Sequence, residues 1–197
     1  MVQKGVSTIL TLGILFLSQS AMALSNTPDQ SWSAGHTRAM AVTSTTIYIG
    51  GGFVTAEGKS RYYLAALDAE TGELKDWNPN ANSDVRALAI SGSTLYVGGD
   101  FTRIAGQTRN CLAAFNMDTG ELLPWNPGVG PNAPYEAFVA SMAVSGSTLY
   151  VGGWFDTIGG QPRGHIAAFN TNTGHLTPWN PGINTHVWAM EVSGSTL

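Results

Sequence analysis

The stretch that decides the fold is VRALAISGSTLYVGGDFTRIAGQTRNCLAAFNMDTGELLPWNPG, residues 85–128, because the chain contains it in three versions. The other two versions begin at Thr37 and Val139, and a partial fourth one begins at Val187. One tyrosine of each complete version marks the period, with separations of 48 and then 54 residues: Tyr48, Tyr96 and Tyr150. A period near 50 residues that contains several short strands is typical of a β-propeller or a related array.

The composition of the unit places four strands in it. Residues 85–90 are mostly apolar and residues 94–97 are β-branched and aromatic, which favours strands. A loop is expected around Gly106, and residues 112–115 and 121–125 supply the third and fourth strands. Four antiparallel strands in roughly 50 residues make one propeller blade. We therefore predict an all-β protein, a β-propeller of four-stranded antiparallel blades, here a partial ring of three blades plus part of a fourth.

The repeats divide the chain into units of nearly constant length. The tryptophan that ends each complete unit follows its tyrosine by 29 residues, so the units have no internal insertions. An extra six residues fall in the connection that carries Tyr135. We predict propeller repeats over residues 37–197, with these boundaries: 37–84, 85–138, 139–186 and a partial unit, 187–197.

Both ends of the repeat array suggest how the ring closes. The partial unit stops inside a strand, and three complete units are fewer than the usual blade number of about four to eight. We therefore expect the sequence to be an N-terminal fragment of a longer propeller. Residues 24–36 carry Trp32 and form either a strand that closes the ring or a tail that packs on the first blade.

The first 23 residues have the pattern of a secretory signal peptide. Lys4 precedes a twelve-residue apolar stretch, residues 6–17, which is too short to span a bilayer comfortably. Residues 21–23 read Ala-Met-Ala, a small-residue cleavage site. The alternative is an uncleaved N-terminal anchor. We expect a secreted or periplasmic protein with no membrane span after cleavage, because no second long apolar run follows.

Composition excludes several other classes of protein. The formal net charge is -4 and the sequence pI is about 5.4. A nucleic-acid binder presents a basic surface, so we expect no nucleic-acid partner. Aromatic residues make up 10% of the chain and charged residues only 11%, the opposite of a disordered chain.

The motifs of the unit also carry two family resemblances. The motifs that carry the first resemblance occur in the order LYVGG-x-F, LAAFN, TG-x-L and WNPG. With them, residues 37–197 resemble the delta-60 repeat of secreted bacterial β-propellers. That resemblance implies a propeller and no single activity. Residues 66–72 followed by Trp77 are more distantly similar to the tryptophan-docking repeat of quinoprotein dehydrogenases. Those enzymes carry an adjacent cysteine pair, whereas this chain has only Cys111, so the second resemblance implies a fold and no quinone cofactor.

Polar residues that recur in every unit are expected to be structural. One arginine position recurs and should bond loop carbonyls or a neighbouring acid: Arg61, Arg109 and Arg163. One turn position carries a side-chain oxygen: Asp68, Asn116 and Asn170. In each turn a second oxygen-bearing side chain lies two residues later and a glycine two residues after that, as in Asp68-x-Glu70-x-Gly72. This spacing is that of calcium loops, but Asx residues also make hairpin turns unaided. We predict structural turns and no cofactor, with calcium as the alternative.

The remaining chemistry-bearing residues show no catalytic or metal-binding spacing. The four histidines lack the H-x-x-x-H pairing of metal sites. His165 stands where the other units have Tyr63 and Cys111, which indicates a tolerant strand position. Cys111 itself is expected to be a small buried apolar residue, with a reactive or intermolecularly paired thiol as the alternative.

Aromatic residues that break the repeat are the candidate ligand-binding residues: Trp154, Tyr135 and Trp188. Trp154 replaces Gly or Asp of the earlier units, Trp188 replaces Arg or Ala, and Tyr135 lies in the insertion. Sites on repeat scaffolds are often built from such insertions, and an exposed aromatic ring can stack on a sugar or anchor a protein partner. The alternative is that they are packing substitutions.

Two functions from different classes follow. We predict a secreted scaffold that acts as a binding or surface-interaction module for a carbohydrate or protein ligand. The alternative is the N-terminal part of a propeller enzyme, of lyase, glycosidase or quinoprotein type, whose active site lies in further blades.

Overall fold

The computed structural model describes residues 36–130 and 136–193. All regular structure in these ranges is β, so they hold no helix that could cross a membrane. The predicted signal peptide, residues 24–35, Tyr135 and residues 194–197 lie outside the described ranges.

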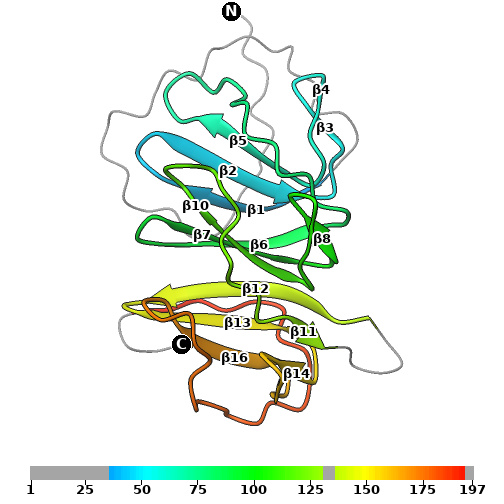
Figure 1. Cartoon of the computed structure of the whole chain (residues 1–197), viewed down its shortest axis with the longest axis vertical. Helices are drawn as coiled ribbons and strands as arrows, with labels where there is room; N and C mark the ends of the chain where they lie inside the picture. The colour runs from blue at the N-terminus through cyan, green and yellow to red at the C-terminus, as the bar shows by residue number, and fades with distance from the viewer. Residues whose placement is uncertain (1–35, 131–135, 194–197) are drawn as a thin grey trace, which may run out of the picture.

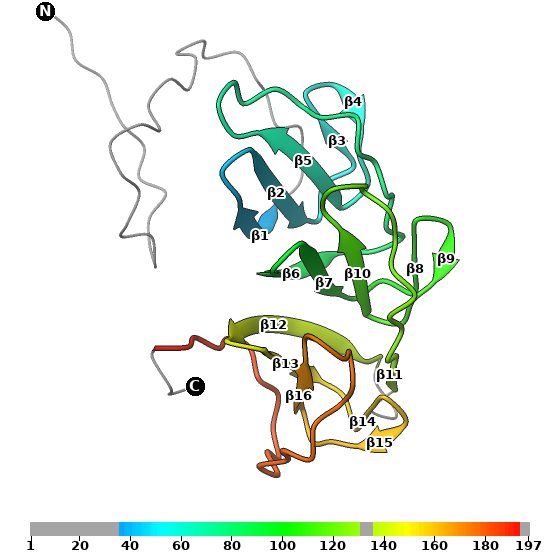
Figure 2. The same ribbon diagram turned by 60° about the vertical axis from the view of Figure 1, so that its left-hand side comes forward.

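Three antiparallel sheets, one from each complete unit, form the blades. The first blade contains β1 (Thr37–Val42), β2 (Thr46–Gly51) and β5 (Leu64–Asp68). The second contains β6 (Val85–Ser91), β7 (Thr94–Gly99) and β10 (Leu112–Asn116). The third contains β12 (Phe138–Ser145), β13 (Thr148–Trp154) and β16 (Ile166–Asn170). The sheets stack one against the next, with β1 beside β6 and β6 beside β12 (Figures 1 and 2). This arrangement confirms the predicted all-β architecture of propeller blades.

The predicted fourth strand of each blade is short. It joins the third strand through a single bridge in each blade: Leu67 with Leu74, Phe115 with Leu122, and Phe169 with Leu176. In the second blade Leu123 N–H also donates to the Ala114 carbonyl, at 2.8 Å. The ladder ends there because Pro124 has no N–H to donate and Trp125 leaves the sheet toward the next blade.

The segment expected to be a loop around Gly106 is a small hairpin instead. It pairs β8 (Arg103–Ile104) with β9 (Gln107–Thr108), and the other units repeat it as β3 (Thr55–Ala56) with β4 (Lys59–Ser60) and β14 (Thr157–Ile158) with β15 (Gln161–Pro162). β11 (Val129–Gly130) pairs with β14 and ties the second unit to the third. The hairpin turn in the second unit places Ala105 and Gly106 at φ of 49° and 73°, as a type I′ turn requires.

The hydrophobic core lies between the blades. Tyr48, Leu64 and Ala66 of the first blade pack with Leu95 and Phe115 of the second. The next interface repeats the arrangement with Tyr96, Leu112 and Ala114 against Leu149 and Phe169. The small alanines leave room for the large side chains of the neighbouring sheet, which is how twisted sheets interdigitate at high packing density.

The paired glycines at the end of each second strand permit close approach at the inner strands. A Cβ atom at Gly98 would lie 2.6 Å from Val139 Cγ1 of the next blade. A Cβ atom at Gly99 would lie 2.0 Å from the Asp84 carbonyl oxygen of its own blade. A side chain at Gly98 would therefore push the second and third blades apart, and one at Gly99 would push β7 away from the start of β6.

Candidate functional site

The candidate site begins at a β-bulge that recurs in the inner strand of each blade. The strand register shifts between Thr37 and Ala39, between Val85 and Ala87, and between Val139 and Ser141. Arg38, Arg86 and Ala140 are the residues that the ladder skips. A bulge re-aims the side chain of its extra residue, and these three side chains converge on one hollow.

This hollow, the axial cavity, has a volume of about 310 Å³. It is lined by the same repeat position of four successive units: Arg38, Arg86, Ala140 and Trp188. Two units thus contribute a guanidinium, one a methyl group, and one an indole ring that is 57% exposed. Breaking the repeat in the third and fourth units therefore gives the cavity two chemically different walls.

Both arginines of the axial cavity are held by carboxylates. Arg38 Nε donates to Asp84 Oδ2 at 2.9 Å. Arg86 makes a two-point contact with Asp100, with Nε 2.5 Å from Oδ1 and Nη2 2.6 Å from Oδ2. The hydrogen bond with Asp100 raises the pKa of Arg86 above its ordinary value, against the opposing effect of desolvation. Charge-assisted pairs of this kind orient both side chains at the cavity wall.

The aromatic side of the site is a continuous set of rings, the aromatic cluster: Phe138, Trp154, His165, His186 and Trp188. Trp154 stacks on His165, with centroids 4.8 Å apart and planes 7° apart, and meets His186 edge-on at 4.5 Å. Trp188 contacts His186 at 5.2 Å and Phe138 at 5.3 Å. The Arg86 guanidinium lies 5.1 Å from the Phe138 ring and links the cluster to the charged wall.

The structure thus brings together two of the three residues singled out from the sequence, Trp154 and Trp188, with His186 between them. Tyr135 lies outside the described ranges and stays a prediction. Sequence reasoning missed Arg38, Arg86 and His186. The shared repeat position of Arg38, Arg86 and Trp188 was the signal available for the two arginines, because equivalent residues of successive blades face a common axis.

The recurring polar residues have the structural roles expected of them. Each recurring arginine donates through Nη2 to the carbonyl fourteen residues later: Arg61 to Lys75, Arg109 to Leu123 and Arg163 to Thr177, at 3.0–3.2 Å. In the turns, the Oδ1 atom accepts backbone N–H groups two and three residues on, as for Asp68 with Glu70 and Thr71 at 3.0 Å. Asn116 and Asn170 make the same Asx turn. Within residues 36–130 and 136–193, no three His, Cys, Asp or Glu side chains gather as metal ligands.

Cys111 is buried, as expected. Its Sγ donates to the Ala137 carbonyl oxygen at 3.2 Å. Burial, with smaller contributions from Asp100 and Glu136, raises the pKa of the Cys111 thiol to about 12. The neutral thiol is therefore the form that the folded protein holds at neutral pH.

The described fold is that of a propeller-type array of blades, and comparison with known families agrees. Residues 94–118 and 148–172 match the family model described as "Domain of unknown function (DUF5122) beta-propeller". The two matched segments are equivalent parts of the second and third units, from the second strand to the Asx turn. No curated protein matches the chain.

Two solved structures of computationally designed proteins share the fold at low sequence identity. The computationally designed Ika4 protein is 18% identical, with a TM-score of 0.54 over 90% of this chain and 88% of that one. The computationally designed Ika8 protein is also 18% identical, with a TM-score of 0.51, and the match covers 80% of this chain but only 40% of Ika8. The extracellular domain of a B. thetaiotaomicron protein is 14% identical over 71% of this chain and 15% of that one, with a TM-score of 0.44.

Proposed function

We propose that the chain is an extracytoplasmic binding module and that its axial cavity binds a saccharide. The observation that carries this proposal is the exposed indole of Trp188 beside two carboxylate-bound arginines in one cavity. The signal-peptide pattern of residues 1–23 supports the location outside the cytoplasm.

The two walls of the cavity suit the two faces of a sugar ring. The indole of Trp188 offers a flat apolar surface to the C–H face of a pyranose, at little cost in conformational entropy. The Arg38–Asp84 and Arg86–Asp100 pairs offer donors and acceptors to hydroxyl groups. Their side chains are 23–40% exposed, so a ligand in the cavity can reach them. A few placed polar groups beside an apolar wall are the usual composition of a ligand pocket.

The aromatic cluster makes the apolar wall rigid. His186 is held between Trp154 and Trp188, and Trp154 is in turn stacked on His165, which is buried. A ring that is already ordered loses less entropy when a ligand binds, which increases affinity. Trp154 therefore acts in this proposal as a support for Trp188, through His186.

A glycan array followed by calorimetry with the best ligand tests the proposal. We expect the wild type to bind at least one glycan, and Trp188→Ala to weaken binding by roughly 30-fold, as loss of an aromatic anchor does. Trp154→Ala should weaken it less, by roughly fivefold, through loss of support. Tyr62→Ala is the matched control, because Tyr62 is an aromatic residue of similar exposure, 44%, that does not line the cavity.

Two outcomes would contradict the proposal. The first is that no glycan binds, and the second is that a glycan binds equally well to the wild type and to Trp188→Ala. Shortened glycans in the reaction mixture would instead support the propeller enzyme considered from the sequence.

A further inference from the structure

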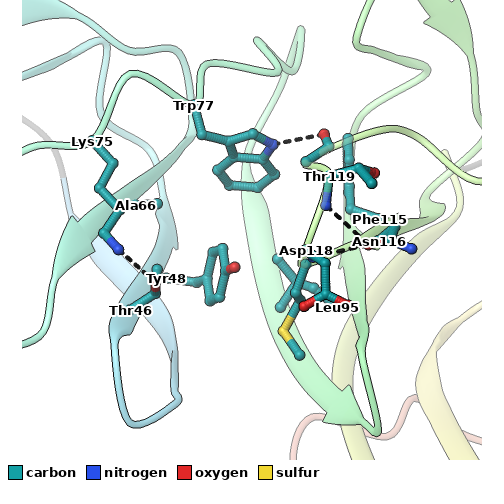
Figure 3. Close-up of a pocket in the computed structure, with 12 residues that line it drawn as sticks. Thr46, Tyr48, Ala66, Lys75, Trp77, Leu95, Phe115, Asn116, Asp118 and Thr119 are labelled. Atoms are coloured by element: carbon teal, nitrogen blue, oxygen red, sulfur yellow. Dashed lines mark hydrogen bonds between the residues drawn. The ribbon is translucent and has the colours of Figure 1, made fainter.

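A second hollow, the rim cleft, lies between the first and second blades, away from the axial cavity. It has a volume of about 240 Å³, and its chemistry-bearing lining residues are Tyr48, Lys75, Trp77, Asn116 and Asp118 (Figure 3). An adjoining hollow of about 370 Å³ shares Tyr48 and Asp118 with it and extends to the turns at Thr45 and Ser93. No lining residue of the rim cleft belongs to the axial cavity.

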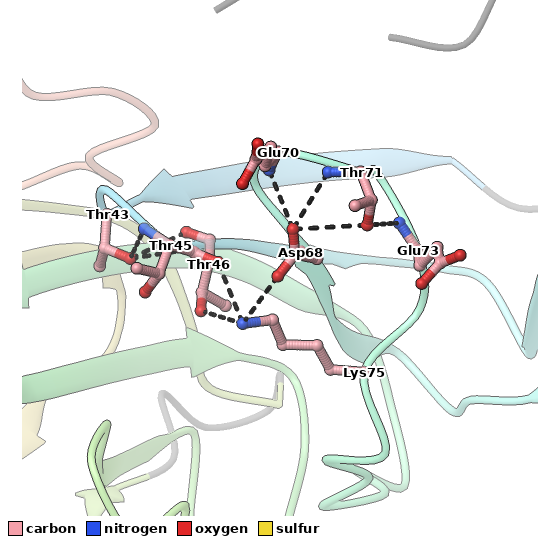
Figure 4. Close-up of polar contacts among 8 residues, drawn as sticks. All are labelled: Thr43, Thr45, Thr46, Asp68, Glu70, Thr71, Glu73 and Lys75. Carbon is pink, nitrogen blue, oxygen red and sulfur yellow. Dashed lines mark hydrogen bonds and ion pairs between the residues drawn. The ribbon is translucent and has the colours of Figure 1, made fainter. Parts of the chain in front are cut away.

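One repeat position differs in chemistry between the rim cleft and the equivalent place in the second unit. The position of Lys75 is held by Leu123 in the second unit, and Leu123 packs against the core between the second and third blades. Lys75 instead lines the rim cleft and ends on polar groups of its own blade. Its Nζ donates to Thr45 O at 3.0 Å and to Thr46 Oγ1 at 2.9 Å, and lies 3.5 Å from Asp68 Oδ2 (Figure 4). The second unit thus has an apolar side chain at this position, whereas the rim cleft has the stem and the paired ammonium of Lys75.

The charge of the rim cleft is negative. The ammonium of Lys75 is already paired with Asp68, whose pKa is lowered first of all by the backbone N–H groups of Thr71 and Glu70. Asp118 is exposed, and within the described residues its carboxylate has no ion-pair partner. Exposed Glu70 and Glu73 follow Asp68 in the same turn region and add to the negative potential.

Aromatic rings form the wall opposite Asp118. Tyr48 and Trp77 meet edge-to-face, with centroids 5.4 Å apart and planes 84° apart. Figure 3 shows the Tyr48 hydroxyl pointing across the cleft toward the turn that carries Asp118. Burial raises the pKa of Tyr48, and the charge of Asp118 raises it further, so the hydroxyl stays neutral beside the carboxylate.

We propose that the rim cleft binds an organic ammonium ion. Its positive charge would lie between the carboxylate of Asp118 and the rings of Tyr48 and Trp77. Aromatic faces attract such cations, and a nearby carboxylate adds an ion pair. The ammonium group can come from a small free molecule such as choline or from a lysine side chain of a peptide.

Calorimetric or NMR titration of the full chain with two probes tests this proposal and separates the sources. Choline represents a free quaternary ammonium ion, and N-acetyl-lysine methylamide represents a lysine side chain. We expect at least one probe to bind, and to bind more weakly at high salt. The neutral isostere of choline, 3,3-dimethylbutan-1-ol, should bind at least about fivefold more weakly than choline, because it lacks the charge.

Variants locate the bound ion. Asp118→Asn should weaken binding by about fivefold or more, whereas Glu73→Gln, which removes an equal charge outside the cleft lining, should weaken it by less than about twofold. Lys75→Leu should place in the cleft the apolar side chain that the second unit has at this position and abolish binding, and thermal unfolding will show that the variant is folded. Trp188→Ala should leave ammonium binding unchanged, so this proposal and the saccharide proposal can fail separately.

Three results would overturn the proposal. They are binding of the neutral isostere as tightly as choline, unchanged affinity in Asp118→Asn, and no binding of either ammonium probe. Binding of glucose at the same residues in place of both cations would show that the cleft is a second saccharide site.

Discussion

The indole nitrogen of Trp77 donates a hydrogen bond to the carbonyl oxygen of Gly120, 43 residues later in the chain and in the next blade, at 2.9 Å. Trp125 makes the same bond to Gly174, also at 2.9 Å. Each indole also lies edge-to-face between a tyrosine of its own unit and a phenylalanine of the next. One tryptophan therefore joins each pair of adjacent blades, by a hydrogen bond and by packing.

Replacing one of these tryptophans should destabilise the protein strongly. We expect Trp125→Ala to lower the free energy of unfolding by about 3–5 kcal/mol, because it removes a large packed side chain and leaves the Gly174 carbonyl without its partner. Trp179→Ala is the comparison. Trp179 packs on Tyr150 but is 38% exposed, so its loss should cost less than about half as much. Urea unfolding of both variants measures the difference, and equal losses would contradict the role of the indole between blades.

The close contact of inner strands makes Gly98 intolerant of a side chain. We expect Gly98→Ala to cost about 1–3 kcal/mol, because its Cβ would lie 2.6 Å from Val139 Cγ1 and the strands would have to separate. Gly52→Ala is the control, since its Cβ would lie 3.1 Å from the Asp84 carboxylate, a side chain that can move. If urea midpoints shift equally for the two variants, blade spacing is not set at Gly98.

The buried arginine of the second unit should be more important for stability than an exposed neighbour. Arg109 donates to the Thr108 and Leu123 carbonyls, at 2.9 and 3.2 Å. We expect Arg109→Met to cost about 1–3 kcal/mol, because the Leu123 carbonyl loses its donor. Arg103→Met removes an exposed side chain with one long contact, 3.3 Å to the Gly106 carbonyl, and should change stability by less than about 0.5 kcal/mol. Chemical denaturation distinguishes the two, and a reversed order would refute this assignment.

The raised pKa of Cys111 predicts low thiol reactivity and a pH dependence of stability. Alkylation requires the thiolate, so iodoacetamide at pH 8 should label the urea-unfolded chain at least about tenfold faster than the folded one, as followed by mass spectrometry. The folded thiol titrates at about 12 rather than at 9.0, so above pH 9 the unfolded state loses this proton first. The Cys111 contribution is therefore complete below pH 9 and is lost as the pH rises toward 12.

Cys111→Ala is the control for this pH dependence. Its free energy of unfolding should fall less steeply than that of the wild type between pH 9 and 11, because the variant lacks the titrating thiol. Identical slopes, or fast labelling of the folded wild type, would contradict a buried neutral thiol.

Several structural features could not be predicted from local patterns. The sequence suggested a tolerant strand position for Tyr63, Cys111 and His165, but the structure places all three before a strand, at φ of 66°, 63° and 62°. Of the three, only His165 is of a residue type that is enriched in the left-handed region, so the position carries no consistent sequence signal. The backbone is instead held there by tertiary hydrogen bonds, such as Cys111 N–H to the Phe101 carbonyl at 2.8 Å.

The candidate site, too, could be predicted from the sequence only in part. Trp154 and Trp188 stood out in the sequence because they break the repeat, but their distance from one another could not be read from their spacing. The bulges at Arg38 and Arg86, which turn these side chains to the axial cavity, depend on backbone contacts of Gly51 and Gly99. The rim cleft is lined by residues of the first and second units, which only the stacking of their sheets brings together.

The sequence by itself determined the repeat, the three long strands of each blade and the Asx turns, because these follow from local residue preferences copied at a fixed period. Only the tertiary structure decided which side chains meet. The Trp77–Gly120 bond, the axial cavity and the rim cleft all join residues from different units. Their formation depends on the stacking of one sheet against the next, which brings together groups that lie some 40 to 150 residues apart in the chain.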